Sequence, residues 1–254
     1  MEAQKVLVTA GASGIGREIA RAFATGGAQV FVVDVNADGL TTLAKESSNI
    51  HTALCDMSSR ADIERMVPEA VRVLGGLDVL VNNAGISGPT APVESFDPVA
   101  WDKVMQINLS GTFDVTRLAI PHLKQSAGGS IVVMSSVAGR FGYPNRSAYS
   151  VSKWGLIGFT KTLSRELGEY GIRVNAILPG AVAGERIEKV LEGRAQVSGR
   201  PVEEERREAM SIQSLQRFVD PRDIAALALF LASDAGKSIS GQMLPVDNDM
   251  QTAS

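Results

Sequence analysis

Short runs of β-branched and other apolar residues alternate along the chain with longer stretches of helical periodicity. The seven short runs are "KVLVTA", "AQVFVVD", "HTALCD", "LDVLVNN", "SIVVMSS", "IRVNAILP" and "QMLPVD". Helical periodicity occurs between them, at 14–26, 59–74, 97–125, 148–169 and 221–233. Because this alternation is typical of repeated strand–helix–strand units, we predict an α/β fold of the doubly wound Rossmann type. Its seven-stranded parallel sheet should carry helices on both faces.

The domain organisation follows from where glycines and charges lie. Glycines mark the ends of expected elements and no stretch has the composition of a linker, so we expect one domain over residues 1–254. The segment 181–216 is long and charged, and "RIEKVLEGRA" and "VEEERREAMSIQ" within it predict two helices. Such an insertion at the carboxyl edge of a parallel sheet often covers a binding site. The alternative is an inert surface lobe.

Composition excludes several classes of function. The chain has 25 basic and 28 acidic residues, a net charge of −3, which does not favour nucleic acid. Its longest strongly apolar run, at 225–232, is shorter than the roughly 20 residues of a membrane span. The first expected strand begins almost at the N-terminus, so we expect no signal peptide and a cytoplasmic protein. A single cysteine, Cys55, and two histidines predict neither a disulfide nor a metal site.

The stretch "TAGASGIG" at 9–16 joins the first expected strand to the first expected helix. The N-terminus of a helix favours an anion, and Gly11 and Gly14 let the backbone approach a pyrophosphate. Gly16 allows the helix to pack close to the sheet. A tight turn that binds no ligand can also use glycine, so this motif alone is weak.

The second expected strand ends in Asp34, 18 residues after Gly16. This spacing is close to the roughly 20 residues expected for a carboxylate that binds the adenosine ribose. Such a carboxylate repels a 2′-phosphate and favours NAD over NADP. The alternative is that Asp34 is a turn or helix-cap residue. Arg17 offers a cation nearby, but we interpret it as a solvated residue paired within its own helix.

Tyr149 and Lys153 are four residues apart in an expected helix and therefore share one face. A free phenol has a pKa of about 10, so a tyrosine that exchanges protons near neutral pH needs a neighbouring cation. Ser136 ends the fifth expected strand, at the edge where open α/β sheets bind ligands. The plain alternative is an amphipathic helix with a half-buried tyrosine.

Together these residues resemble the short-chain dehydrogenases and reductases, in their single-domain NAD-type branch. The resemblance covers nearly the whole chain and includes Asp34, with spacings of 13 residues from Ser136 to Tyr149 and 4 from Tyr149 to Lys153. Its other motifs are "TAGASGIG", "CDM", "NNAG", "INLSGTF", "MSSVAG", "YSVSK", "LPG" and "DPRDIAALALFLASDAGKSISGQ".

The resemblance implies a reversible hydride transfer between a secondary alcohol or carbonyl and the nicotinamide of NAD. Tyr149 would be the general acid or base, Ser136 would orient the substrate oxygen, and Lys153 would favour the phenolate and hold the nicotinamide ribose. Asn108 would place a water in the proton relay. The family also suggests a homotetramer that acts on a small alcohol or ketone.

The same resemblance implies a set of cofactor-binding residues. Asp56 and Met57 would contact the adenine, and the last three of the set would lie beside the nicotinamide. The full set is Gly11, Ser13, Gly14, Ile15, Gly16, Asp34, Val35, Asp56, Met57, Asn83, Ala84, Gly85, Tyr149, Lys153, Pro179, Gly180 and Val182.

Three positions depart from the family pattern. Ala10 replaces the first glycine of the loop, Gly184 replaces a threonine expected to contact the carboxamide, and "DND" at 247–249 replaces "DGG". The turn must therefore tolerate a methyl group, and the packing of the tail is in question.

Two other functions compete with an NAD-linked alcohol dehydrogenase. One is an NADPH-dependent 3-oxoacyl thioester (acyl carrier protein) reductase, which Asp34 opposes. The other is a non-catalytic dinucleotide-binding regulator, which the set Asn108, Ser136, Tyr149 and Lys153 opposes. Arg140, Arg146 and Arg186 flank the expected pocket and suggest an anionic or polyol substrate. The preferred interpretation is that these arginines make surface or subunit contacts.

Overall fold

In the computed structural model, which describes residues 3–126 and 128–252, the strands form one seven-stranded sheet with the order β3-β2-β1-β4-β5-β6-β7. All neighbouring strands run parallel, as predicted. The strands are β1 (Lys5–Thr9), β2 (Gln29–Asp34), β3 (Ile50–Leu54), β4 (Val79–Asn82), β5 (Ser130–Met134), β6 (Arg173–Pro179) and β7 (Met243–Val246). The predicted doubly wound α/β fold is confirmed.

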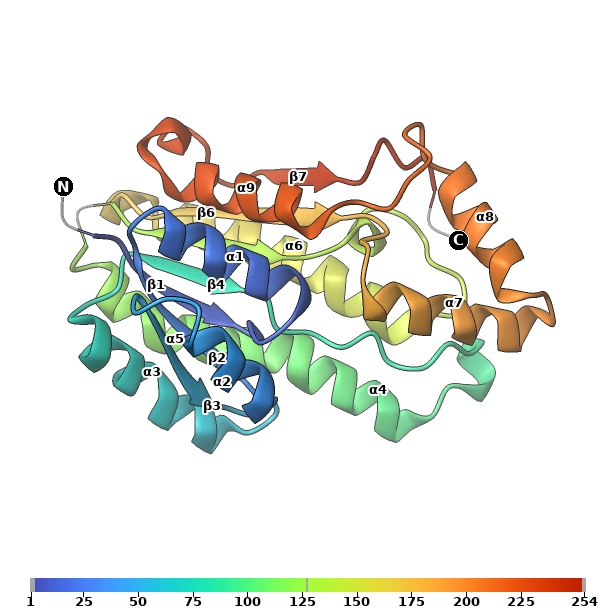
Figure 1. Ribbon diagram of the computed structural model, residues 1–254, viewed down its shortest axis with the longest axis horizontal. Coiled ribbons are helices and arrows are strands. Elements are labelled where there is room, and N and C mark those ends of the chain that lie inside the picture. Colours follow the sequence, from blue (N-terminus) through green and yellow to red (C-terminus); the bar gives the residue numbers. More distant parts are fainter. Residues whose placement is uncertain (1–2, 127, 253–254) are drawn as a thin grey trace.

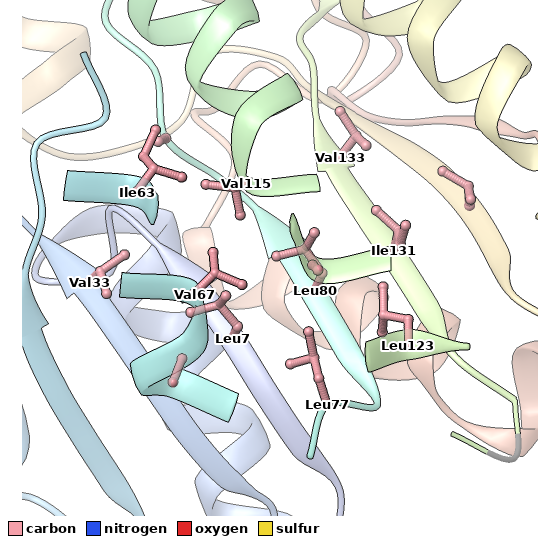
Figure 2. Close-up of a cluster of buried hydrophobic side chains, with 14 of the residues drawn as sticks. Leu7, Val33, Ile63, Val67, Leu77, Leu80, Val115, Leu123, Ile131 and Val133 are labelled. Carbon is pink, nitrogen blue, oxygen red and sulfur yellow. The ribbon is translucent and has the colours of Figure 1, made fainter. Parts of the chain in front are cut away.

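The strands are continuously apolar because both faces of the sheet are covered. In β1, Leu7 belongs to one buried cluster, whereas Val6 and Val8 belong to the cluster on the opposite face. All three side chains are fully buried. Figure 2 shows the first cluster, in which Leu7 and Leu80 of the sheet lie beneath side chains of the covering helices.

The helices divide between the two faces (Figure 1). One face is covered by α3 (Arg60–Leu74), α5 (Thr112–Leu123) and α6 (Ser147–Glu166). The other is covered by α1 (Gly14–Thr25), α2 (Ala37–Ala44) and α9 (Pro221–Ala232). The sequence did not predict α2, which has only eight residues. Asn36 caps its N-terminus, and the Asn36 side chain accepts a hydrogen bond from Gly39 N.

The single helix predicted at 97–125 is interrupted. It comprises α4 (Pro98–Met105), the π-helical segment η2 (Gln106–Gly111) and α5. A π-helical turn widens the helix locally and is frequent at functional sites. The interruption contains Asn108.

Two features of the sheet define where a ligand can bind. Since β1 pairs with both β2 and β4, the strand order reverses beside β1, and open α/β sheets bind ligands in the crevice at such a switch point. The two helices predicted within 181–216 are present as α7 (Glu185–Ser198) and α8 (Val202–Ser211). Figure 1 shows them at the end of the molecule toward which the β7 arrow points, beyond the carboxyl edge of the sheet.

Candidate active site

The glycine-rich loop leaves bare backbone at the N-terminus of α1. A Cβ placed on Gly14 would meet no atom within 4 Å, so this backbone faces open space. Ser13 precedes the helix and its side chain makes no capping hydrogen bond. Ile15 packs against the buried cluster beneath it. The first N–H groups of the helix are therefore accessible, and they suit a phosphate group.

Ala10 takes the left-handed backbone conformation itself, with φ of 51°. Gly11 does not relieve the turn, because its φ is not positive. Gly11 is instead needed for space, since a Cβ there would lie 2.4 Å from Cγ1 of Val32. The methyl group of Ala10 is thus accommodated in a conformation that L-residues seldom adopt.

Asn83, which directly follows β4, holds this loop in place. Its Nδ2 donates to the carbonyl oxygens of Thr9 at 3.1 Å and Ala10 at 2.9 Å. In return, Oγ1 of Thr9 accepts the backbone N–H groups of Asn83 and Ala84, both at 3.0 Å. A Cβ on Gly16 would lie 2.5 Å from Asn83 Nδ2, so α1 and this amide can approach only because residue 16 is glycine.

Asp34 lies half-buried at the carboxyl end of β2. Its Oδ2 accepts the backbone N–H of Ala12 and its Oδ1 that of Asn36, both at 3.0 Å. The helix cap considered for Asp34 is supplied by Asn36 instead. Asp34 therefore ties the glycine-rich loop to the second strand, and its carboxylate oxygens keep further acceptor capacity for ribose hydroxyls.

The arginines of α1 are paired with carboxylates. Arg17 contacts Glu46, and Arg21 donates to Glu46 at 2.6 Å and to Glu18 at 2.6 Å. The interpretation that Arg17 pairs within its own helix was therefore wrong, because Glu46 lies beyond α2. Arg17 and Arg21 are therefore both paired with carboxylates.

The expected adenosine-side residues line the neighbouring loops. Val35 is exposed directly after Asp34. Asp56 is exposed and accepts two hydrogen bonds from Ser58. Met57 is buried, and its carbonyl oxygen lies against η2. Cys55 is buried as well, and burial raises the pKa of its thiol to about 12, which makes it unreactive.

Asn108 is fully buried in η2 and bridges two parts of the site. Its Oδ1 accepts the N–H of Ile86 at 2.8 Å, and its Nδ2 donates to the Ile86 carbonyl at 3.0 Å and to Oγ of Ser152 at 2.9 Å. The sequence analysis did not single out Ser152, which is also buried and lies between Tyr149 and Lys153 in α6. Asn108 therefore joins the loop after β4 to the helix that carries the tyrosine.

The structure brings Tyr149, Lys153 and Asn108 together near Gly85. Nζ of Lys153 lies 5.6 Å from the ring centroid of Tyr149. A Cβ on Gly85 would lie 3.3 Å from Lys153 Nζ and 3.2 Å from Asn108 Oδ1. Ser136 follows β5 and is 7% exposed, and its Oγ accepts the N–H of Ala138 at 3.1 Å. Among the described residues, the Ser136 hydroxyl has no acceptor for its proton.

Lys153 is buried to 3% exposure, and its Nζ donates to the carbonyl oxygen of Met134 at 2.8 Å. Burial, with a smaller effect of the Arg186 charge, lowers the pKa of Lys153 to about 7. The ammonium is therefore close to its titration point at neutral pH, where a second charged or polar group in the site can bias it.

The expected nicotinamide-side residues follow β6. Pro179 ends the strand, and a Cβ on Gly180 would lie 2.8 Å from the Cα of Asp247. Val182 forms an isolated bridge with Val219. Gly184 precedes α7 with φ of 134°, a conformation in which the threonine expected from the family would be strained.

The tail departs from the family pattern without losing its packing. Asn248 and Asp249, which replace two glycines, both have φ of 56°, and Asn and Asp tolerate this region better than other side chains. Asn248 Nδ2 donates to the carbonyl oxygen of Arg217 at 2.7 Å, and Ser214 Oγ donates to Asp249 Oδ2 at 2.5 Å. The tail thus fastens the segment that follows α8.

The three arginines near the expected pocket differ from one another. Arg140 is 52% exposed in its side chain and lies 4.0 Å from Asp247. Arg186 is exposed and donates to the carbonyl oxygen of Gly85 at 2.5 Å. Arg146 is only 3% exposed, so the preferred interpretation of a surface contact was wrong for this residue. The sequence pattern around Arg146 does not report burial, so no signal in the sequence indicated that this residue would be buried.

A nicotinamide dinucleotide fits these residues. The open backbone at Gly14 and the half-buried carboxylate of Asp34 lie beside the switch point at β1, and the buried ammonium of Lys153 lies at the carboxyl end of β5. Within residues 3–126 and 128–252, no cluster of histidine, cysteine or carboxylate side chains is suited to a metal ion. In the same part of the chain, no helix is long and apolar enough to cross a membrane.

Comparisons with known proteins agree with this geometry. A family model described as enoyl-(acyl carrier protein) reductase matches residues 9–250. The chain is 39% identical to D-beta-hydroxybutyrate dehydrogenase of Cupriavidus necator, over 97% of each protein.

Two solved structures are similar over nearly the whole chain. An actinorhodin polyketide ketoreductase with NADPH is 33% identical with a TM-score of 0.92, covering 97% of this chain and 96% of that one. An NAD+-bound xylitol dehydrogenase is 29% identical with a TM-score of 0.92, covering 96% and 97%. With a seven-stranded parallel sheet, a family match over nearly its full length and relatives of this kind, the chain belongs to the short-chain dehydrogenase/reductase family of oxidoreductases.

Proposed function

We propose that the protein is an NAD-dependent oxidoreductase that interconverts a secondary alcohol and a carbonyl compound, with Tyr149 as general acid and base. One observation carries this proposal. Lys153 Nζ lies 5.6 Å from the Tyr149 ring at the carboxyl edge of the sheet, on the side of α6 that also contacts Asn108 through Ser152. A regulator that only binds a dinucleotide has no use for a buried ammonium beside a tyrosine.

The chemistry divides between the cofactor and the chain. When bound, the nicotinamide accepts or supplies the hydride. In the oxidative direction, Tyr149 takes the proton of the substrate hydroxyl, and Ser136 orients the same oxygen by hydrogen bonding. Lys153 favours the phenolate electrostatically, and Asn108 holds the loop at Ile86 against α6 so that these groups keep their positions.

NAD is proposed as the cofactor because of charge at the expected ribose site. The carboxylate of Asp34 opposes a 2′-phosphate, and Arg17 and Arg21, which could attract one, are paired with Glu46. The proposed contacts of the dinucleotide lie in the glycine-rich loop, at the end of β2, in the loops after β3, β4 and β6 and in α6. They are the residues of the set given above, among them Gly11, Asp34, Val35, Tyr149 and Lys153.

Dissociation constants of NADH and NADPH, measured by quenching of protein fluorescence, test this assignment. We expect NADH to bind at least about tenfold more tightly, since a close charge repulsion is worth 1.4 kcal/mol or more. Asp34→Asn should narrow the difference, whereas Asp38→Asn, at an exposed site in α2, should not. Preference of the wild-type protein for NADPH would contradict the assignment.

A second candidate is an NADPH-dependent reductase of 3-oxoacyl thioesters. It is favoured by the description of the matching family model and by the similarity to a polyketide ketoreductase with NADPH. Efficient NADPH-dependent reduction of an acetoacetyl thioester, together with tight NADPH binding, would replace the first proposal with this one.

The proposal extends to α7 and to the assembly. In α7, Arg186 bonds to Gly85 and Gly193 lies against Thr90, which supports α7 and α8 as a cover over the substrate within a single domain. Elsewhere on the surface, α5 and α6 expose Phe113, Val151 and Trp154, which are 47%, 45% and 50% exposed. This apolar face suits a second copy of the chain, in keeping with a homotetramer. Sedimentation that shows only monomers would contradict the assembly.

A further inference from the structure

Arg186 connects two loops at the carboxyl edge of the sheet. It is the second residue of α7, the helix that follows β6. Its Nη2 donates to the carbonyl oxygen of Gly85, in the loop after β4, at 2.5 Å. The two residues are 101 positions apart in the chain. The contact therefore joins the first turn of α7 to the part of the sheet where we propose that the cofactor binds.

Gly85 lies between the two ends of the proposed cofactor site. Two residues before it, Asn83 Nδ2 lies 2.5 Å from where a Cβ of Gly16 would be, so this end of the loop adjoins the N-terminus of α1. On the other side, a Cβ on Gly85 would lie 3.3 Å from Lys153 Nζ. A dinucleotide that extends from the N-terminus of α1 to Lys153 therefore passes Gly85, where the Arg186 guanidinium lies.

The charge of Arg186 acts on the same part of the site. Burial is the main cause of the lowered pKa of Lys153, and the Arg186 charge lowers that pKa further. Because such an effect weakens with distance, it agrees with the position of both cations beside Gly85. A phosphate oxygen placed next to Arg186 would offset this repulsion.

The acceptor that Arg186 has in this structure is a single neutral oxygen. A phosphate group offers a guanidinium a full negative charge and two oxygens in a geometry that matches its parallel N–H groups. A backbone carbonyl offers neither the charge nor the second oxygen. The Arg186 guanidinium would therefore bind a phosphate more strongly than it binds the Gly85 carbonyl.

The position of α7 does not depend on Arg186 alone. The helix packs on α8 through a small cluster whose buried members are Ile187, Val190, Leu191 and Ala209. Farther along α7, a Cβ on Gly193 would lie 2.9 Å from Thr90 Oγ1, so the helix also lies directly against the loop after β4. Arg186 itself is exposed. Its side chain can therefore change partner while the helix stays in place.

We propose that Arg186 is a further cofactor-binding residue, whose guanidinium exchanges the Gly85 carbonyl oxygen for an oxygen of the dinucleotide pyrophosphate. The inference rests on the proposed function, because it takes the dinucleotide as the ligand of this site. The phosphate concerned is the one on the nicotinamide side, since Gly85 adjoins Lys153. Cofactor binding then fastens the first turn of α7 across the site, so the cover forms on the complex with the cofactor alone.

Fragments of the cofactor test which part of it Arg186 contacts. Dissociation constants of NADH, ADP-ribose, AMP and adenosine are measured calorimetrically for the wild-type protein and for Arg186→Gln. NADH and ADP-ribose contain both phosphates, whereas AMP contains only the adenosine-side phosphate and adenosine contains none. We expect Arg186→Gln to weaken NADH and ADP-ribose about tenfold or more and to change AMP and adenosine by less than about twofold. If the protein prefers NADPH, the 2′-phosphorylated fragments are used with the same criterion.

Matched variants separate a phosphate contact from a general effect of charge. Lys189→Gln removes the same charge at an exposed position of α7 and should change none of the four constants. Arg186→Lys should recover part of the loss, because it keeps the charge but not the planar pair of donors. An NADH affinity of Arg186→Gln within about twofold of the wild type would overturn the proposal, whatever happens to the KM of the substrate.

Two other outcomes would also overturn it. Tighter binding of NADH by Arg186→Gln would show that the contact with Gly85 closes the site against the cofactor. Equal weakening of AMP and ADP-ribose would place Arg186 at the adenosine-side phosphate instead.

Hydrogen exchange in α7 measures the effect on the cover. ADP-ribose, at concentrations that saturate each protein, should slow exchange in the first turn of α7 in the wild type and not in Arg186→Gln. Equal slowing in both proteins would contradict the fastening of α7 by Arg186.

Neither measurement needs turnover, so failure of this inference and failure of the proposed function are distinguishable. If no alcohol is oxidised but Arg186→Gln weakens NADH and ADP-ribose as expected, only the proposed reaction fails. If an alcohol is oxidised and Arg186→Gln binds NADH as the wild type does, only the role of Arg186 fails. A wild-type protein that binds no dinucleotide would overturn both.

Discussion

Nδ2 of Asn83 donates a hydrogen bond to the carbonyl oxygen of Ala10 at 2.9 Å. This bond holds Ala10, the one alanine of the glycine-rich loop with a left-handed backbone conformation. The same amide lies 2.5 Å from where a Cβ of Gly16 would be. Residues 10, 16 and 83 thus form a single contact between the loop after β1, the helix α1 and the loop after β4. The shape of the proposed phosphate site depends on this contact.

Gly16→Ala should destabilise the protein and weaken cofactor binding. The added methyl group would lie 2.4 Å from the carbonyl oxygen of Ala10, and backbone must move to make room. Such overpacking costs about 1–3 kcal/mol. Urea unfolding and NADH titration check both effects. Gly168→Ala is the control, because a Cβ there meets no atom within 4 Å, and equal behaviour of the two variants would contradict the close packing at residue 16.

Ala10→Gly should stabilise the protein. A left-handed conformation costs an L-residue about 1–2 kcal/mol, which glycine avoids. Glycine offsets roughly 0.5–1 kcal/mol of this gain, because its unfolded chain loses more conformational freedom on folding. The net gain of about 1 kcal/mol should raise Tm by about 2–4 °C for a chain of this size. Ala12→Gly, at a buried neighbour without a positive φ, should lower Tm. A lower Tm for Ala10→Gly as well would show that the methyl group contributes packing that exceeds the strain.

The layout of the fold was predictable because it depends on patterns that recur along the chain. The strands are continuously apolar, and helices such as α1 and α9 have one apolar face, so the sheet and its covering layers follow from periodicity. Elements without a strong pattern were missed. The helix α2 is short and follows a local Asn36 cap, and the periodicity of 97–125 does not distinguish the π-helical hydrogen bonding of η2 from that of an α-helix.

The candidate site was predictable only in part. Helical spacing placed Tyr149 and Lys153 on one face of a helix, and the resemblance to the family added Asn108 to the site. Spacing does not report burial or long-range pairing. The burial of Arg146 depends on the loop 87–90, and the pairing of Arg17 with Glu46 depends on how α2 ends beside α1.

The low pKa of Lys153 should appear as a pH-dependent effect on stability. Between its folded value of about 7 and its usual value of 10.5, the unfolded chain binds a proton that the folded chain does not. Stability of the wild-type protein therefore rises with pH in this window. Replacing Lys153 with Met removes the effect.

Urea unfolding of the wild-type protein and Lys153→Met at pH 7.5 and 9.5 measures it. The unfolding free energy of the wild type minus that of Lys153→Met should rise by about 2 kcal/mol between the lower and the higher pH. Lys161→Met, at an exposed residue of the same helix, should show no such shift. A difference for Lys153→Met that is the same at both pH values would contradict the low pKa in the folded state.

The central claim is that Tyr149 transfers the proton in an NAD-linked oxidation, and Tyr149→Phe tests it most directly because it removes only one oxygen. NADH formation with the best substrate of the wild-type protein should fall at least about a hundredfold, as expected for loss of a general acid or base. The dissociation constant of NADH should stay within about twofold, and Tyr170→Phe, at a half-exposed tyrosine after α6, should keep full activity. Undiminished turnover by Tyr149→Phe would contradict the account.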